Sequence, residues 1–275
     1  MAAMAVWPPA SVMSAEIDWD APAPSTVLMI AGKKFPLDFG GGEFTIHGTP
    51  LVVFETSNSG LGTGLTVWDG SVVLAKFLEA RYSTLQGQNV VELGCGPGLA
   101  GLTAAALGAD VTLTDLDYAL DGARAGVARN AAALKGRVDV AELDWYSPQV
   151  SSAAASARSA DIVLAADVVW VEELIAPLAR TLGWIARRPD AAGKPPPQIF
   201  IAHQTRARAS DMLFSARLRE EGLICHPLER SLLHPYFQDA AIEILSIERL
   251  HNVDNVDHDH DHDHNHDHDH GDKDL

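Results

Sequence analysis

Strand-like and helix-like segments alternate along most of this chain, and that alternation constrains the fold more than any other feature. Between residues 89 and 221, four of five short apolar runs are followed by a segment with apolar residues at helical spacing. Parallel strands need long crossovers, so the pattern predicts an α/β fold with a mainly parallel sheet and helices on both faces. The predicted strands are 89–94, 110–115, 137–145, 161–170, 198–204, 223–230 and 241–250, and the predicted helices are 66–81, 99–108, 118–136, 172–188 and 208–221, with 151–159 as a loop.

Composition divides the chain into four regions. Residues 57–250 hold the alternating series and form the predicted α/β domain. Residues 25–56 alternate apolar and polar types around glycine breaks, which predicts an N-terminal extension formed by a short β-hairpin or meander. Residues 1–24 are rich in Ala and Pro, and residues 251–275 are rich in His and Asp. Because neither segment could bury a core, both are predicted to be disordered.

Charge and cysteine content narrow the class of partner. The formal net charge is −17, of which residues 251–275, with nine Asp and one Lys, contribute −8 and the rest −9. That balance repels phosphate backbones, so we expect no nucleic-acid partner. No apolar run is long enough to span a bilayer, so we expect no membrane partner either. Cys95 and Cys225 are the only cysteines, which favours a reducing compartment. We therefore expect a monomer in the cytoplasm.

The most informative stretch runs from Val90 to Gly101. An apolar strand leads through Gly94, Gly96 and Gly98 into an Ala- and Leu-rich helix, and the next strand ends in Asp115. Glycines let the chain turn tightly and let a ligand approach the backbone, and the start of the helix presents free N–H groups. An acid at the end of the second strand can accept hydrogen bonds from both hydroxyls of a ribose. The pattern therefore predicts an adenosine-containing ligand at the carboxyl ends of the strands.

Other nucleotide sites fit this motif less well. A P-loop requires GxxxxGK[ST], which the chain lacks. A dinucleotide fingerprint for NAD or FAD requires GxGxxG. Counted from Gly94 its last position is Leu99, and counted from Gly96 it is Gly101, inside the helix. NAD and FAD are therefore poorer candidates, and a glycine turn without any ligand is the remaining alternative.

Five blocks of the sequence resemble the seven-β-strand, class I S-adenosylmethionine-dependent protein-lysine methyltransferases, the methyltransferase family 16 group. The blocks follow in the same order and spacing as in that family, at 60–79, 90–115, 141–145, 160–182 and 199–218. The resemblance implies a Rossmann-like class I fold with S-adenosyl-L-methionine as cofactor. It also implies methyl transfer to a lysine side chain of a non-histone protein.

The same resemblance implies roles in the cofactor site. Trp68 would pack on the cofactor, Asp115 would hold its ribose, and Asp144 with Trp145 would hold the adenine. The residues expected along the methionine portion are Gly94, Cys95, Gly96, Gly98, Ala166 and Asp167. Without the resemblance, Trp68 is better explained as a core aromatic than as a cofactor residue. For Trp145 the two explanations are equally good. Cys95 is expected to be a small buried hydrophobe rather than a nucleophile.

Asp167 and Trp170 resemble the family's Asp-x-x-aromatic motif, with Trp in place of the usual Tyr or Phe. A lysine amine is protonated at neutral pH, since its reference pKa is about 10.4. A carboxylate beside an aromatic wall attracts the ammonium and packs on its stem, so these two are the candidate catalytic residues. The alternative for Asp167 is an N-cap of the following helix. The N-terminal extension and the loops 146–159 and 203–210 would form the rim that docks the protein substrate.

Two other functional classes fit the sequence. One is a small-molecule methyltransferase, and the other is a catalytically silent partner-binding module with a metal-binding tail. The segment 257–270, DHDHDHDHNHDHDH, offers imidazole and carboxylate ligands to zinc, nickel or copper. We interpret that affinity as adventitious, because methyl transfer needs no metal, and we predict no metal site in the domain.

Overall fold

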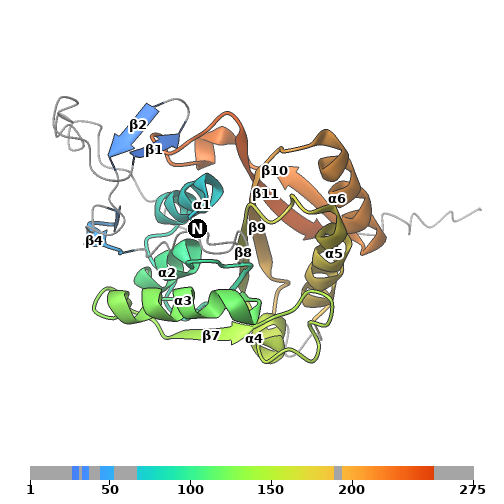
Figure 1. Ribbon diagram of the computed structural model, residues 1–275, viewed down its shortest axis with the longest axis horizontal. Coiled ribbons are helices and arrows are strands. Elements are labelled where there is room, and N and C mark those ends of the chain that lie inside the picture. Colours follow the sequence, from blue (N-terminus) through green and yellow to red (C-terminus); the bar gives the residue numbers. More distant parts are fainter. Residues whose placement is uncertain (1–26, 31–32, 37–43, 53–66, 189–193, 251–275) are drawn as a thin grey trace, which may run out of the picture.

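Seven strands form the central sheet of the computed structural model, which describes residues 27–30, 33–36, 44–52, 67–188 and 194–250 (Figure 1). The strands are β5 (Asn89–Leu93), β6 (Asp110–Asp115), β7 (Val138–Glu142), β8 (Ile162–Ala166), β9 (Gln198–Gln204), β10 (Leu223–Pro227) and β11 (Ile242–Arg249). Their order is β10-β11-β9-β8-β5-β6-β7. The pairs β5–β6, β5–β8, β6–β7 and β8–β9 are parallel, whereas β11 is antiparallel to β9 and β10. The predicted mainly parallel sheet is confirmed.

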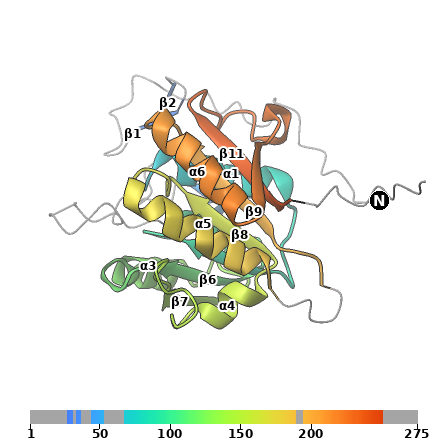
Figure 2. The same ribbon diagram turned by 90° about the vertical axis from the view of Figure 1, so that its right-hand side faces the viewer.

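Helices cover both faces of this sheet, as predicted. One face carries α1 (Asp69–Arg81), α2 (Leu99–Ala106) and α3 (Asp117–Asn130). The other carries α4 (Ala154–Ser159), α5 (Glu172–Ala186) and α6 (Arg208–Glu220). Figure 2 shows α5 and α6 lying in front of the sheet. Among the described residues, no helix is both long enough and apolar enough to cross a membrane.

The central strands are continuous apolar runs because both of their faces are buried. Along β9, Phe200 and Ala202 belong to the core on the side of α1 and α2, and Ile199 and Ile201 to the core on the side of α5 and α6. Burying one such aliphatic or aromatic side chain contributes roughly 1.5–3 kcal/mol. The two cores together fix the sheet on which the site is built.

Two small antiparallel hairpins precede the domain. The pair β1 (Val27–Ile30) and β2 (Lys33–Pro36) confirms the predicted N-terminal hairpin. The second, β3 (Thr45–Ile46) and β4 (Thr49–Pro50), lies in the same segment 25–56 that was predicted to form strands. His47 and Gly48 connect its strands with φ of 46° and 77°, the positive values that a tight two-residue hairpin turn requires. The predicted arm 1–24 and the predicted tail 251–275 lie outside the described residues.

Several elements differ from the prediction in their limits. The Ser/Ala-rich segment 151–159 is not all loop, because α4 occupies its second half. The helix predicted over 118–136 ends at Asn130, whose side chain is hydrogen-bonded to the backbone of Val52. The strands predicted over 137–145 and 161–170 end earlier, at Glu142 and Ala166. The site residues that follow these strands therefore lie in loops: Asp144, Trp145, Asp167 and Trp170. The last predicted strand pair is shortened too, and a short 3₁₀ helix, η2 (Arg230–Leu232), follows β10.

Candidate active site

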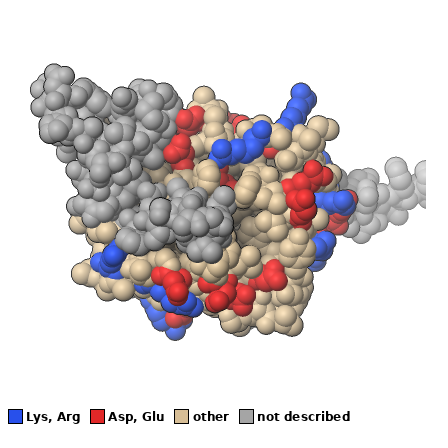
Figure 3. Space-filling view, viewed as in Figure 1, with Lys and Arg blue, Asp and Glu red and all other residues tan. Residues whose placement is uncertain are grey.

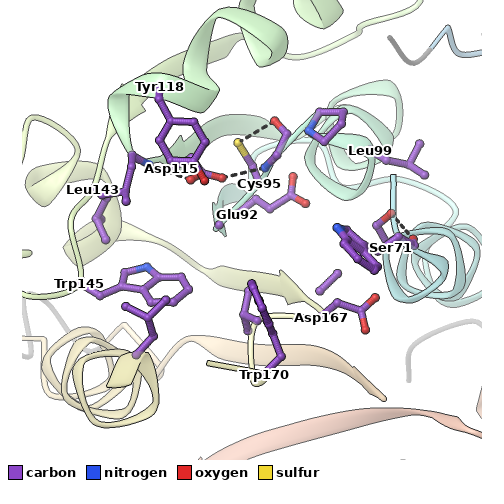
Figure 4. Close-up of a pocket in the computed structure, with 18 of the residues that line it drawn as sticks. Ser71, Glu92, Cys95, Leu99, Asp115, Tyr118, Leu143, Trp145, Asp167 and Trp170 are labelled. Atoms are coloured by element: carbon purple, nitrogen blue, oxygen red, sulfur yellow. Dashed lines mark hydrogen bonds between the residues drawn. The ribbon is translucent and has the colours of Figure 1, made fainter. Parts of the chain in front are cut away.

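A cavity of about 210 Å³ opens at the carboxyl ends of β5, β6 and β8 (Figure 4). Glu92, Cys95 and Asp115 lie on one side of it, and Trp145, Trp170 and Asp167 on the other. Ten of the eleven residues predicted from the sequence line this cavity: Trp68, Gly94, Cys95, Gly96, Asp115, Asp144, Trp145, Ala166, Asp167 and Trp170. Segments as distant as α1 and the loop after β8 therefore meet at the place where parallel sheets bind ligands.

The turn after β5 lines one side of the cavity. Gly94, Gly96 and Gly98 have φ of 62°, 51° and 81°, in the left-handed region that favours glycine. Gly98 does not line the cavity, in contrast to its expected place along the cofactor. It is the N-cap of α2, and a Cβ there would come within 2.8 Å of Leu113 Cδ1. Gly98 therefore allows close packing of α2 on β6.

Asp115 is held by two backbone amides. Gly96 N–H donates to its Oδ2 at 2.9 Å, and Leu116 N–H donates to its Oδ1 at 2.8 Å. Burial raises the pKa of this carboxyl, and the two hydrogen bonds oppose the rise. Each oxygen keeps a further lone pair, so the carboxylate can still accept two hydroxyl donors from a ligand.

Asp144 and Trp145 form a turn beside Asp115. Tyr146 N–H donates to Asp144 Oδ1 at 2.9 Å, and the Ser151 hydroxyl accepts a bond of 3.1 Å from Asp144 N–H. The Trp145 ring packs so closely that a Cβ on Gly94 would lie 3.2 Å from it. This corner thus presents an apolar wall with a carboxylate next to it.

Glu92 is a lining residue that was not predicted from the sequence. It is 2% exposed, and its Oε2 accepts the Gly101 N–H at 2.7 Å. Burial raises the pKa of its carboxyl to about 8, and the Gly101 hydrogen bond opposes the rise. The feature of the sequence that could have identified Glu92 is an acid within the apolar run VVEL. Tyr118 and Tyr146, both half-exposed or more at the mouth, were also missed, because nothing in their local pattern separates them from ordinary surface aromatics.

Cys95 is buried in the same turn, as expected. Desolvation raises the pKa of its thiol well above the usual value, and the nearby acids Glu92 and Asp115 add to the rise. A thiolate nucleophile is therefore disfavoured, and Cys95 serves as a small packed side chain.

Asp167 occupies a strained position directly after β8. Its φ is 54°, in the left-handed region that non-glycine residues seldom adopt. Its own N–H donates to Ala202 O at 2.9 Å, and its Oδ2 accepts the Gly70 N–H at 2.9 Å. The alternative role as N-cap of α5 is wrong: the residue at that cap is Val171, and Asp167 instead accepts a hydrogen bond in the first turn of α1.

The surroundings of Asp167 combine apolar burial with charge. Burial raises the pKa of its carboxyl, while the Gly70 hydrogen bond and the charges of Arg206 and His203 oppose the rise. Burial and the neighbouring Asp167 also raise the pKa of Asp69. A second cavity of about 160 Å³ lies against the same carboxyl group and is lined by Trp68, Asp167, Trp170 and Arg206. Within the described part of the chain, no cluster of His, Cys, Asp and Glu could hold a metal ion.

Comparisons with known proteins identify the family of the chain. A lysine methyltransferase family model matches residues 47–220, more than half of the chain. Protein N-lysine methyltransferase METTL21A of Danio rerio is 42% identical over 130 residues, which cover 44% of this chain and 55% of that protein. EEF1A lysine methyltransferase 3 of Mus musculus is 32% identical over 175 residues, which cover 64% of this chain and 70% of that protein.

The chain spans about half the length of the METTL21A relatives it matches, at 54–56%. Among solved structures, a TehB-like SAM-dependent methyltransferase from Corynebacterium glutamicum has a TM-score of 0.44 and 18% identity, covering 67% of this chain and 88% of that one. The family model, in contrast, includes the glycine turn, Asp115 and Asp167 within its matched range. By that match, the chain belongs to the lysine methyltransferase family.

Proposed function

We propose that this protein is an S-adenosylmethionine-dependent N-methyltransferase that modifies a lysine side chain of another protein. The observation that carries the proposal is the position of Asp167. Its buried carboxylate borders both cavities, and Trp68 and Trp170 line both as well. A cofactor in the larger cavity and a cationic side chain in the smaller one would meet at this carboxylate.

The larger cavity fits the methyl donor in its chemistry. Asp115 offers two lone pairs to ribose hydroxyls, and the glycine turn lets a ligand lie against backbone without meeting a Cβ. Trp145 supplies an apolar wall for a flat ring. The acids Asp115 and Asp167 suit a ligand that carries positive charge at its sulfonium and amino groups.

The smaller cavity fits a lysine in the same way. The aromatic walls of Trp68 and Trp170 can pack on a long aliphatic stem, and Asp167 can orient the nitrogen by accepting an N–H. Apolar burial favours the neutral amine, which alone has a free lone pair. When bound, the cofactor supplies a methyl group: the nitrogen lone pair forms the new N–C bond as the C–S bond breaks, its electron pair remaining on sulfur. The proton that the ammonium loses beforehand passes to solvent.

A folded protein is the proposed acceptor, and the names of the relatives support that class. The mouse relative is named for EEF1A, so EEF1A is one protein to test first. Acidic side chains form several patches on the face shown in Figure 3, interspersed with basic ones, and would attract a lysine-bearing surface. Both described cysteines are free, which supports our further proposal that the enzyme works in the cytoplasm.

Methyl transfer to the proteins of a lysate tests the proposal. Purified protein is first titrated with S-adenosylhomocysteine and NAD by calorimetry, and we expect binding of the former alone. A lysate is then labelled with tritiated-methyl S-adenosylmethionine, and the labelled protein is identified by mass spectrometry. We expect the label on a lysine.

Asp167→Asn is the matched control for chemistry. It keeps the size of the side chain and a carbonyl oxygen for the Gly70 N–H, so cofactor affinity should stay within a few-fold while transfer falls sharply. Label on arginine, histidine or a carboxylate, or only in metabolites, would refute the lysine assignment. No turnover in any fraction, with cofactor binding intact, would favour a silent partner-binding module.

A further inference from the structure

The smaller cavity already holds a cation. Arg206, in the loop after β9, extends its guanidinium over the Trp68 ring, with Cζ 5.3 Å from the ring centre. One guanidinium nitrogen lies 3.6 Å from Asp167 Oδ1. Both partners of Arg206 are therefore the groups that the proposed function assigns to the acceptor ammonium, a carboxylate and an indole face.

The Asp167 carboxylate is only partly satisfied by this contact. Its side chain is 6% exposed, and Oδ2 is hydrogen-bonded to Gly70 N–H. Within the described residues, Oδ1 is buried and has no hydrogen-bond partner. A separation of 3.6 Å is long for a hydrogen bond, so Arg206 compensates the charge mainly by Coulomb attraction. A donor that reached Oδ1 more closely would replace Arg206 at a net gain.

The backbone that carries Arg206 is held in place, while the side chain is open to solvent. His203 Nε2 lies 2.8 Å from Asp211 Oδ1, and the Thr205 hydroxyl donates to Asp211 Oδ2 at 2.8 Å. Asp211 lies in the first turn of α6 and so ties the loop to that helix. The Arg206 side chain itself is 43% exposed. Its guanidinium can therefore rotate outward without movement of the loop.

We propose that Arg206 is a built-in competitor of the acceptor: it occupies the cation site formed by Asp167 and Trp68 in the free enzyme and must swing out when the substrate side chain enters. This inference rests on the proposed function for the identity of the cation, a primary ammonium. It makes Arg206 a specificity-determining residue, because only a side chain whose donor comes closer to Oδ1 than the guanidinium does, within hydrogen-bond distance, can displace it.

Arg206→Gln tests the competition, with Arg219→Gln as the matched control. Arg219 is an exposed arginine in the last turn of α6, outside the docking loop 203–210, and it lines neither cavity. Arg206→Gln should lower the KM of the protein substrate roughly two- to five-fold, the range for loss of a half-exposed ion pair. Arg206→Lys should stay near wild type, because a cation is retained. Arg219→Gln should leave KM unchanged.

A pH profile separates competition from a loosened loop. The charges that face Asp167 are Asp69 on α1, His203 on β9 and Arg206. Removing the cation should shift the acidic limb of kcat/KM to higher pH, since Asp167 would then be easier to protonate. A loosened loop would lower kcat without moving that limb. An unchanged or raised KM in Arg206→Gln would overturn the proposal.

Binding of n-butylammonium, followed by saturation-transfer NMR in the presence of S-adenosylhomocysteine, gives a readout that needs no activity. Arg206→Gln should bind this probe more tightly than wild type does, and Arg219→Gln should bind it as tightly as wild type does. Equal affinity in all three proteins would overturn the competition even if the enzyme methylates lysine. Tighter binding in Arg206→Gln without lysine methylation by wild type would leave the competition standing and refute the proposed function instead.

Discussion

Replacing Lys76 by Met removes one half of a buried ion pair between two positions of α1. Lys76 Nζ lies 2.8 Å from Glu79 Oε2, and the two side chains are 8% and 7% exposed. Nζ also donates to the carbonyl of Thr45 and lies 4.7 Å from the centre of the Phe44 ring. Burial lowers the pKa of the Lys76 ammonium, and Glu79 opposes that change. The pair therefore fastens the hairpin of β3 and β4 onto α1.

The expected loss follows from the charge that is left behind. Removing one partner of a buried pair typically costs about 3–5 kcal/mol, because the remaining ion has neither water nor a counter-charge. The total stability of such a domain is about 5–15 kcal/mol, so the effect should be large. The double variant Lys76→Met/Glu79→Gln removes both charges and keeps an acceptor for the His47 N–H, which now lies 2.6 Å from Glu79 Oε1. It should recover most of the loss.

Urea unfolding followed by circular dichroism at pH 7.5 measures both variants. The single variant should shift the midpoint strongly to lower urea, and the double variant should return towards wild type. A loss below about 1 kcal/mol in the single variant would show that the pair is solvated like a surface salt bridge. A double variant no more stable than the single one would show that lost packing, not the unpaired charge, is responsible.

Three further predictions concern single titratable groups. Asp115→Asn should weaken S-adenosylhomocysteine binding by 1.5–3 kcal/mol, roughly ten- to 150-fold, in calorimetry, because one acceptor oxygen is lost. Burial raises the pKa of the Glu92 carboxyl to about 8. The contribution of Glu92 to stability is therefore full below about pH 4.5 and is lost as the pH rises towards 8. Glu92→Gln should remove this pH dependence, which amounts to up to about 5 kcal/mol in urea unfolding. Burial lowers the pKa of His234 to about 4, so its contribution is full above about pH 6.5 and falls by about 3 kcal/mol as pH drops to 4, a slope that His234→Asn should abolish.

The fold and most of the site were predictable because the information is local. Strands buried on both faces are short apolar runs, and the residues that follow parallel strands gather at one edge of the sheet. Asp115 could be placed in the site from its position at the end of a predicted strand, whereas Asp144 and Asp167 were placed there by the resemblance to the family. Gly98 could not be separated from Gly94 and Gly96, because all three need positive φ and only packing against Leu113 distinguishes it.

The long-range contacts could not be predicted from the sequence. Lys76 and Glu79 are three residues apart on a helix, a spacing that normally marks a solvated surface pair. They are buried only because Phe44 and Phe237, from distant segments, close over the ammonium. The bond between Gly70 and Asp167 joins residues 97 positions apart, and no local pattern announces it. Arg206 was counted only as part of a docking loop for the same reason.

The backbone of Asp167 indicates that this residue is kept for its carboxylate rather than for stability. A non-glycine residue at φ 54° carries strain of about 1–2 kcal/mol, and the buried Oδ1 adds to the burden. Asp167→Gly removes the strain and the charge, and Asp167→Ala removes the charge alone. We expect the free energy of unfolding of Asp167→Gly, measured in urea, to exceed that of Asp167→Ala by about 1 kcal/mol. Both variants should lose methyl transfer. Equal stability of the two variants would mean that the backbone is not strained there, whereas transfer by either variant would show that the carboxylate is dispensable for the chemistry.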